Sequence, residues 1–131
     1  LLTTISTDSF GSTAQLFCGG GNNQTWLWTP TSFVWEELAA AGPDVTQSTI
    51  VGYQSSAFVF GGVTSDTSIA NNRLWQFNYT AFPGQGWVQI GAANAPTARQ
   101  GHVASIYNDE MIVFGGQDSS GRLLNDIWSY K

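Results

Sequence analysis

Apolar residues along this chain gather in short runs that are separated by polar, glycine-rich segments. Continuous apolar runs are typical of strands buried on both faces, whereas strict alternation marks strands with one face in water. Phe, Val, Ile and Trp favour strands, and the Gly, Asn, Ser, Thr and Asp between the runs favour turns. The pattern therefore predicts an all-β protein built from many short strands. Three of the runs end on a glycine pair: Leu16-Phe17-Cys18-Gly19-Gly20, Phe58-Val59-Phe60-Gly61-Gly62 and Ile112-Val113-Phe114-Gly115-Gly116.

The glycine pairs belong to an internal repeat. They are 42 and then 54 residues apart, and a period of about 50 residues with variable loops suits a β-propeller blade better than a helical solenoid. Each pair is followed by an apolar residue and a tryptophan, at Leu27-Trp28, Leu74-Trp75 and Ile127-Trp128, and the first two copies add Trp35 and Trp87. The strands we expect are 4–9, 14–18, 25–29 and 33–38 in the first copy, 48–53, 57–61, 73–78 and 86–90 in the second, and 101–107, 111–115 and 125–130 in the third.

The repeat resembles the Kelch family, and the third copy carries the fullest match. Pro96-Thr97-Ala98-Arg99-Gln100-Gly101-His102 is similar to the family's entry motif, residues 111–116 to its second strand and double glycine, and Asn125-Asp126-Ile127-Trp128-Ser129-Tyr130 to its third strand. When the copies are aligned on the glycine pairs without gaps, Val45 and Ser48 of the second copy and Thr3 and Ser6 of the first match Arg99 and His102.

The resemblance implies blades made of four-stranded antiparallel sheets, in a propeller of which this chain is one part. The blades are expected at residues 1–42, 43–95 and 96–131, the last without its outer strand. Because three blades are fewer than a closed propeller needs, we expect the remaining blades to come from a longer parent chain or from another protomer.

A blade packed between two neighbours explains the repeated residue types. A glycine pair fits the end of the second strand if the backbone takes a positive φ there, or passes so close to a neighbour that a Cβ would clash. The tryptophans are suited to filling the wedge between adjacent sheets, and Asn125 and Asp126 to satisfying the amides of the turn. The expected framework residues are Gly19, Gly20, Trp28, Trp35, Gly61, Gly62, Trp75, Trp87, Arg99, Gly101, His102, Gly115, Gly116, Asp126 and Trp128.

Charge narrows the range of partners. The 131 residues include nine Asp and Glu against four Lys and Arg, which gives a formal net charge of -5. A chain of this charge lacks the basic footprint of a nucleic-acid-binding protein. The longest apolar runs are far shorter than the roughly 18 residues that span a bilayer. We therefore expect neither nucleic-acid binding nor membrane insertion of this segment.

The residues that usually carry chemistry are scarce. His102 is the only histidine and Cys18 the only cysteine, so no cluster of metal ligands is expected. His102 is predicted to hydrogen bond to backbone on an inner strand, and Cys18 to be a small buried apolar residue. The acidic pairs Glu36-Glu37 and Asp109-Glu110 are interpreted as solvated surface. We expect no catalytic residue, metal or cofactor.

These observations favour a non-enzymatic scaffold that binds protein partners through its inter-strand loops. The loops with most freedom are 64–72 and 117–124, with Arg73 and Arg122 as candidate partner-binding residues. One alternative is the propeller part of a secreted enzyme resembling the copper-radical oxidases that include galactose oxidase, which need a Tyr-Cys cross-link and Tyr and His metal ligands. The other is a surface propeller that binds glycans, for which Trp26 is the candidate residue.

Two N-glycosylation sequons bear on the cellular setting. They are Asn23-Gln24-Thr25 and Asn78-Tyr79-Thr80, which makes Asn23 and Asn78 candidate glycan acceptors. The scarcity of lysine and the abundance of Thr, Asn and Gly point the same way. A secreted or cell-surface glycoprotein is expected, with a cytoplasmic protein as the alternative.

Overall fold

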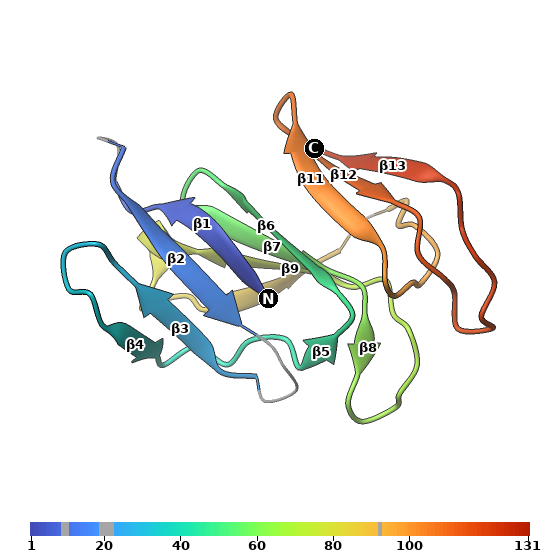
Figure 1. Ribbon diagram of the computed structural model, residues 1–131, viewed down its shortest axis with the longest axis horizontal. Coiled ribbons are helices and arrows are strands. Elements are labelled where there is room, and N and C mark those ends of the chain that lie inside the picture. Colours follow the sequence, from blue (N-terminus) through green and yellow to red (C-terminus); the bar gives the residue numbers. More distant parts are fainter. Residues whose placement is uncertain (9–10, 19–22, 92) are drawn as a thin grey trace.

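The structure is a computed structural model that describes residues 1–8, 11–18, 23–91 and 93–131. Within these ranges the chain forms three antiparallel sheets in sequence order, packed face to face with their inner strands adjacent (Figure 1). This confirms the predicted all-β fold. Gly19 and Gly20, the first expected glycine pair, lie outside the described residues.

Each sheet is a meander that runs from an inner to an outer strand. Sheet 1 consists of β1 (Leu2–Ser6), β2 (Thr13–Cys18), β3 (Thr25–Trp28) and β4 (Trp35–Leu38). Sheet 2 consists of β6 (Thr49–Tyr53), β7 (Ser56–Phe60), β9 (Leu74–Asn78) and β10 (Trp87–Ile90). Sheet 3 consists of β11 (Val103–Tyr107), β12 (Glu110–Phe114) and β13 (Ile127–Tyr130). The sheets follow the three predicted repeats, whose exact boundaries stay a prediction.

The first predicted strand is wrong, because β1 runs over Leu2–Ser6 and not over 4–9. Six residues of the sequence separate β1 from β2, whereas the other two sheets make this turn in two residues, 54–55 and 108–109. Leu1 exchanges two backbone hydrogen bonds of 3.0 Å with Cys18, so it corresponds to Thr49 and Val103, which pair with Phe60 and Phe114. The gapless alignment therefore misplaced Thr3 and Ser6 as counterparts of Arg99 and His102.

Some local structure lies outside the four-strand pattern. A two-stranded ribbon pairs β5 (Val45–Thr46), at the entry to sheet 2, with β8 (Val63–Thr64), just after the second glycine pair. A 3-10 turn, η1 (Tyr79–Ala81), follows β9. The ribbon was not predicted, since two-residue strands have no periodicity of their own.

The core lies between the sheets, as expected for blades. Sheet 1 contributes Ile5, Leu16 and Leu27 against Ala57 and Phe77 of sheet 2, with Trp75 and Trp87 packed alongside. Sheet 2 contributes Val51, Phe60 and Leu74 against Met111 and Val113 of sheet 3, with Trp128 packed alongside. Sheet 2 is therefore covered on both faces, whereas sheets 1 and 3 each have one open face. Trp28 and Trp35 lie on the open face of sheet 1, in one row with Thr4 and Gln15.

Candidate interaction surface

Both predicted binding loops lie at one end of the three sheets. Loop 63–72 follows β7 and loop 117–124 follows β12, and the segments that enter sheets 2 and 3 lie beside them (Figure 1). Isolated bridges join Asn71 to Arg99 and Gln100 to Gln117. We call this side of the molecule the loop end. An antiparallel meander places these connections together because alternate turns leave a sheet on the same side.

Arg99 lies at the loop end, and its guanidinium is fully buried. Its Nη1 and Nη2 donate to the two carboxylate oxygens of Asp126, each at 2.8 Å, and Nη1 also donates to Gly115 O at 2.9 Å. Nε donates to Thr97 O at 3.1 Å. Paired, charge-assisted hydrogen bonds of this kind hold the two groups in a defined geometry. Arg99 therefore ties the entry segment of sheet 3 to the glycine turn of the same sheet.

Asp126 has a different role from the one expected. Its carboxylate binds Arg99 and accepts a 2.7 Å hydrogen bond from the Trp128 indole Nε1, and these donors hold the pKa of the Asp126 carboxyl well below its usual range. The amide of Gly115 is satisfied by the backbone oxygen of Asp126, at 3.3 Å, and not by its side chain. The prediction that this side chain satisfies the turn amides is wrong, because both carboxylate oxygens of Asp126 accept hydrogen bonds from the buried guanidinium of Arg99.

In the second and third glycine pairs, the second glycine meets both conditions that the sequence suggested. Gly62 has φ +84° and Gly116 has φ +91°. A Cβ on Gly62 would lie 2.6 Å from Thr46 O, and one on Gly116 would lie 2.6 Å from Gln100 O. No side chain fits at either position without moving the backbone of the entry segment.

In sheet 2 an amide binds the glycine turn. Asn71 Nδ2 donates to Gly62 O at 2.9 Å and to Gly61 O at 3.4 Å, while its Oδ1 accepts from the backbone amide of Arg73 at 2.9 Å. Gly61 N donates to Arg73 O at 3.0 Å, the same bond that Gly115 makes to Asp126. Arg73 therefore occupies the position of Asp126. Sequence reasoning missed Asn71, although an Asn after a glycine pair is a usual turn signal.

The side chain of Arg73 is available at the surface. It is exposed, and no ion pair of the described part of the chain includes it. It borders a cavity of about 260 Å³ that is also lined by Asp44, Val45, Ser65, Asp66 and Trp75. The Ser65 hydroxyl donates to Asp44, and a hydrogen bond from Thr64, with the charge of Arg73 adding to it, lowers the pKa of Asp66. The cavity thus combines charges of both signs with an apolar wall.

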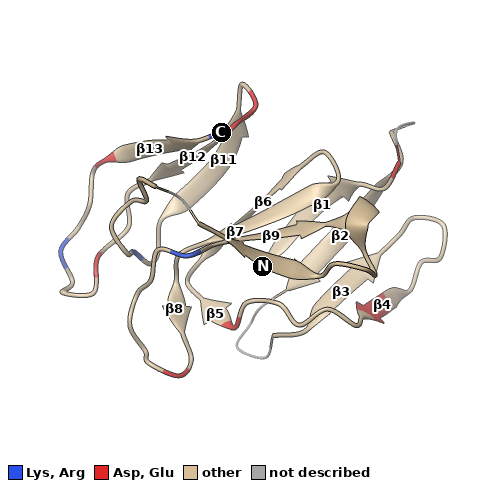
Figure 2. Cartoon of the chain, turned by 180° about the vertical axis from the view of Figure 1, so that it is seen from behind, with Lys and Arg blue, Asp and Glu red and all other residues tan. Residues whose placement is uncertain are grey.

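Arg122 is exposed on the second loop. Its Nε donates to Asp118 Oδ2 at 3.2 Å, and Asp118 also accepts from Ser120 Oγ at 2.6 Å and from the backbone amides of Ser120 and Arg122. These hydrogen bonds, led by the Ser120 hydroxyl, lower the pKa of Asp118. Asp118 thereby shapes the loop that presents Arg122. Figure 2 shows that most charge lies in loops, although β4 carries Glu36 and Glu37 and β12 begins at Glu110.

His102 is buried between sheets 2 and 3. Its Nε2 lies 2.9 Å from Thr49 Oγ1, and its ring meets the edge of Phe60 at a centroid distance of 5.3 Å. Burial lowers the pKa of His102 to about 4, which outweighs the opposing effect of the Phe60 backbone. The sequence predicted a backbone partner for this ring, whereas Nε2 contacts a side-chain hydroxyl of the neighbouring sheet. The adjacent Gly101 has φ +65° and donates to Gln47 O at 2.9 Å.

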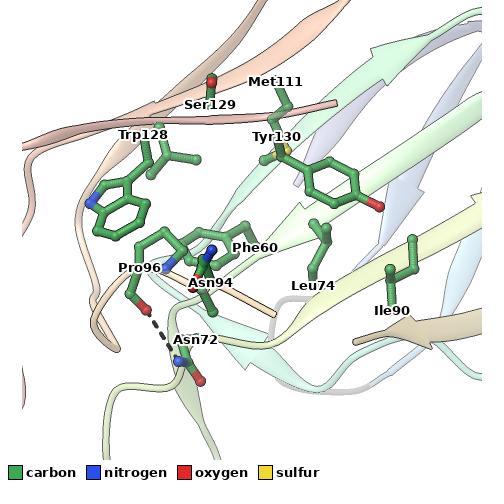
Figure 3. A pocket seen from close by; sticks show the side chains of 12 residues that line it. Phe60, Asn72, Leu74, Ile90, Asn94, Pro96, Met111, Trp128, Ser129 and Tyr130 are labelled. Atoms are coloured by element: carbon green, nitrogen blue, oxygen red, sulfur yellow. Dashed lines mark hydrogen bonds between the residues drawn. The ribbon is translucent and has the colours of Figure 1, made fainter. Parts of the chain in front are cut away.

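A smaller cavity, of about 60 Å³, lies where Trp128 and Tyr130 of sheet 3 face Phe60, Leu74 and Ile90 of sheet 2 (Figure 3). It has room for a few water molecules only. Near it, Asn72 Nδ2 donates to Pro96 O at 3.1 Å. We interpret it as a gap in the packing between the sheets.

The remaining predicted residues are dispersed. Cys18 is fully buried, and burial raises the pKa of its thiol to about 12. Trp26 is half-buried on the open face of sheet 1. Asn23 is exposed, and Asn78 Oδ1 accepts from the amide and hydroxyl of Thr80. Over the residues that the structure describes, no three His, Cys, Asp or Glu side chains are grouped as metal ligands.

Comparison with known proteins shows the family and the fold. A family model described as the KLHDC2/KLHL20/DRC7 Kelch-repeats domain matches residues 6–131. Tip elongation aberrant protein 1 of Schizosaccharomyces pombe is 29% identical over 83% of this chain and 10% of its own length. Leucine-zipper-like transcriptional regulator 1 homolog of Drosophila melanogaster is 31% identical over 72% of this chain and 10% of its own length. The chain therefore spans about a tenth of these relatives.

A solved structure supports the same fold. The structure of YjhT, a Kelch-type propeller, matches 91% of this chain and 34% of its own length with a TM-score of 0.69 and 22% identity. No helix in the described residues has the length and hydrophobicity to cross a membrane.

Proposed function

This chain belongs to the Kelch-repeat family, and on that premise we propose that it is a protein-interaction domain that binds a partner segment at its loop end. The observation that carries the proposal is Arg73, an exposed cation without an ion pair in the described structure, beside a cavity of about 260 Å³. In folds that serve many functions, binding resides in loops held by a rigid scaffold.

The scaffold under these loops is well fixed. Asn71 binds the glycine turn at one end of loop 63–72, and Arg99 with Asp126 binds the turn that precedes loop 117–124. Asp118 accepts four hydrogen bonds within the second loop. Loops ordered before binding lose less conformational entropy when a partner arrives. This supports a preformed surface.

The chemistry of the surface suggests what it binds. Arg73 and Arg122 offer guanidinium groups that pair with carboxylates, and Val45 and Trp75 form an apolar wall of the cavity that Arg73 borders. The partner we propose is a polypeptide segment with an Asp or Glu next to an apolar side chain. The net charge of -5 works against strongly acidic partners at long range, so recognition depends on close contact.

Binding is favoured over catalysis by the state of the two side chains with reactive potential. Cys18 is buried with a pKa of about 12, so its thiolate is scarce at neutral pH. His102 is buried with a pKa of about 4 and packs against Phe60. The rival hypothesis, a copper-radical oxidase, is tested by metal analysis of the purified protein, where stoichiometric copper would contradict our proposal.

The proposal can be tested with peptides. A phage-displayed library of random peptides is selected on the immobilised chain, and the enriched peptides are titrated against Arg73→Ala and Arg122→Ala. We expect peptides with an Asp or Glu next to an apolar side chain, and their affinity should fall about tenfold on Arg73→Ala, since a charge-assisted hydrogen bond contributes about 1.5 kcal/mol.

The matched control is Lys131→Ala, which removes an exposed cation paired with Glu110 on the opposite end. We expect this variant to bind the selected peptides as the unmodified chain does. Peptides that bind all three variants equally, or a selection that enriches nothing, would contradict the loop end as the binding surface.

We also infer a secreted or cell-surface setting, supported by the two sequons. Asn23 is exposed at the loop end, and Asn78 is the last residue of β9, where it caps the 3-10 turn η1. Expression through a secretory pathway followed by glycosidase treatment tests this, with Asn23→Gln and Asn78→Gln assigning the sites. We expect a loss of mass at Asn23. No change in mass would favour the cytoplasmic alternative.

A further inference from the structure

A second cavity with polar groups, of about 220 Å³, opens between sheets 2 and 3 at the end opposite the loop end. This end carries the two-residue turns 54–55 and 108–109, and we call it the turn end (Figure 1). Side chains of both sheets form apolar and aromatic walls around the cavity: Tyr53, Phe58, Ile106, Met111 and Tyr130. The cavity is therefore a largely aromatic wedge between two sheets.

The size of the turn-end cavity limits what it can hold. Pockets that enclose drug-sized ligands measure about 300–1,000 Å³, whereas one water molecule takes up about 30 Å³. A space of about 220 Å³ therefore suits a single side chain. The cavity in Figure 3 shares Met111 and Tyr130 with this one, but at about 60 Å³ it is too small for such an occupant.

The polar groups around the cavity include hydrogen-bond acceptors that the protein leaves free. Asp109 Oδ1 accepts a 3.0 Å hydrogen bond from the Tyr53 hydroxyl, which itself accepts from Gln54 Nε2 at 3.1 Å. Within the described ranges, no hydrogen bond or ion pair reaches Asp109 Oδ2. Gln76 Nε2 donates to Ser56 Oγ at 3.1 Å, and in the same ranges nothing donates to Gln76 Oε1. An occupant with several donors would satisfy these oxygens.

Asp109 is held by its own turn and by Tyr53. Asn108 and Asp109 have φ of +50° and +63°, as in the type I′ turn that suits a two-residue hairpin. From this turn the Asp109 side chain reaches across to sheet 2, where the Tyr53 hydroxyl binds it. The same hydrogen bond raises the pKa of Tyr53, so the phenol stays protonated and remains a donor. A carboxylate held in this way loses little conformational freedom when it pairs with a cation.

Charge favours a cation at the turn end. The neighbouring acid, Glu110, is paired with Lys131 at 3.2 Å, whereas no cation of the described residues is paired with Asp109. The net charge of -5 adds a long-range attraction for cations. At the loop end the same net charge opposes the acidic segment of the proposed function. Aromatic rings add a further attraction for a cation that lies over their faces.

We propose that the turn-end cavity binds an arginine side chain of a partner polypeptide, with the guanidinium paired to Asp109 and in contact with the aromatic walls. A guanidinium carries five donors in a planar fork, whereas a lysine ammonium carries three and is more strongly hydrated. The fork can pair with a carboxylate through two parallel hydrogen bonds and can stack on aromatic rings. This site is separate from the loop-end surface and does not depend on it.

The probe is the capped tripeptide acetyl-Gly-Arg-Gly-amide, which is titrated into the isotopically labelled chain while amide resonances are followed by NMR. We expect saturable shifts at Phe58, Asp109 and Tyr130. Matched peptides carry citrulline or lysine in place of arginine. Citrulline keeps the shape of the side chain without its charge and should bind about tenfold more weakly, since a charge-assisted hydrogen bond contributes about 1.5 kcal/mol. The lysine peptide should fall between the two.

The matched variants change the charge of the chain at one end or the other. Asp109→Asn should weaken binding of the arginine peptide about tenfold, and it should fold because asparagine tolerates the left-handed backbone at this position. Asp66→Asn removes the same charge at the loop end and should change the affinity by less than about twofold, because salt screens distant charges. Lys131→Ala removes an exposed cation that lines the cavity and should strengthen binding about threefold. Circular dichroism checks the fold of each variant.

Arg73→Ala separates this site from the loop-end surface of the proposed function. We expect it to weaken the peptides selected at the loop end and to leave binding of the arginine peptide unchanged. The inference is overturned if the citrulline peptide binds as tightly as the arginine peptide, or if Asp109→Asn and Asp66→Asn weaken binding equally, which would indicate a general attraction to the net charge. Lysine binding as tight as arginine binding, or no saturable shift at the turn end, would overturn it as well.

Discussion

At the third glycine pair a buried arginine binds the turn, whereas at the second pair an asparagine amide does so. Arg99 reaches Gly115 O at 2.9 Å and carries its charge into the interior with Asp126 as counter-ion. Asn71 reaches Gly62 O at 2.9 Å with no charge at all. The two turns share the bond made by the first glycine amide, Gly61 N to Arg73 O at 3.0 Å and Gly115 N to Asp126 O at 3.3 Å, whereas Gly62 N also donates to Arg99 O at 2.8 Å.

In each turn one side chain donates to a glycine carbonyl, Arg99 to Gly115 O and Asn71 to Gly62 O, so the donor can be a different residue type in each copy. Where the donor is Arg99, its buried charge needs a counter-ion. Asp126, the residue before β13, supplies it and is therefore held in the ion pair. Where the donor is neutral Asn71, no counter-ion is needed from the residue before β9. That residue can therefore be an exposed cation, Arg73. The neutral arrangement thereby leaves a charged side chain available for binding at the loop end.

The largest effect is expected where both turns are alike. Gly62→Ala places a Cβ 2.6 Å from Thr46 O at φ +84°, and we expect a loss of about 3 kcal/mol or more in the free energy of unfolding, because left-handed strain and overpacking add. Gly116→Ala should cost as much. Urea denaturation measures both. Gly91→Ala, with nothing near its Cβ, should change little; equal effects at all three sites would contradict the close-approach argument.

The second prediction concerns the charged arrangement alone. Asp126→Asn keeps the shape of the side chain but leaves the buried Arg99 guanidinium without a counter-charge. We expect a loss of about 3 kcal/mol, the low end for a broken buried pair, because Asp126 itself is 39% exposed and water already meets it. Arg122→Ala breaks the exposed pair with Asp118 and should change the urea midpoint little. A comparable loss in both variants would show that burial is not the cause.

The third prediction separates two pH windows. The pKa of His102 falls from 6.5 unfolded to about 4 folded, so the folded state favours the neutral ring. This contribution is present above pH 6.5 and is lost as the pH falls toward 4. At about 1.4 kcal/mol per pKa unit it amounts to at most about 3.5 kcal/mol. His102→Ser, which copies Ser48 of the second repeat, should flatten the stability profile in this window.

The carboxyl of Asp126 acts at lower pH. Its folded pKa is depressed, so its contribution is present above the unfolded value of about 3.9 and is lost as the pH falls below it. Asp126→Asn should therefore flatten the profile only on the acid side. A His102→Ser profile that still fell between pH 6.5 and 4 would show that another group carries the upper window.

The sequence predicted the strands of sheets 2 and 3 to within two residues because their first hairpins turn in two residues and the glycine pairs keep a fixed register. It failed for β1, since nothing in the local sequence shows that β1 and β2 are separated by four more residues than the corresponding strands of the other sheets. The glycines were interpretable from spacing alone. The contact between Arg99 and Asp126 was not, because it joins positions 27 residues apart whose pairing exists only once the sheet has formed.

The candidate surface was predicted in part. Loops 64–72 and 117–124 were identified by their length, but their position at one end follows from the meander, which sequence spacing did not show. Asn71 was missed because its counterpart in the third repeat is Leu124, so the repeat itself gave no reason to single it out. When different positions supply the side-chain donor in different copies, an alignment of the copies does not identify these residues.

The smallest expected effect concerns Asn71, the side-chain donor at the second glycine turn. Asn71→Leu gives the second repeat the residue of the third, and it removes the donor to Gly62 O and the acceptor for Arg73 N. We expect a loss of about 1–2 kcal/mol in urea, as for unpaired polar groups that remain partly solvated. Asn71→Asp restores only the acceptor and should lose about half as much, with faster hydrogen exchange at Gly61 than at Gly115. If Asn71→Leu were neutral, the Gly62 carbonyl would need no side-chain donor, and the freedom of Arg73 would have another origin.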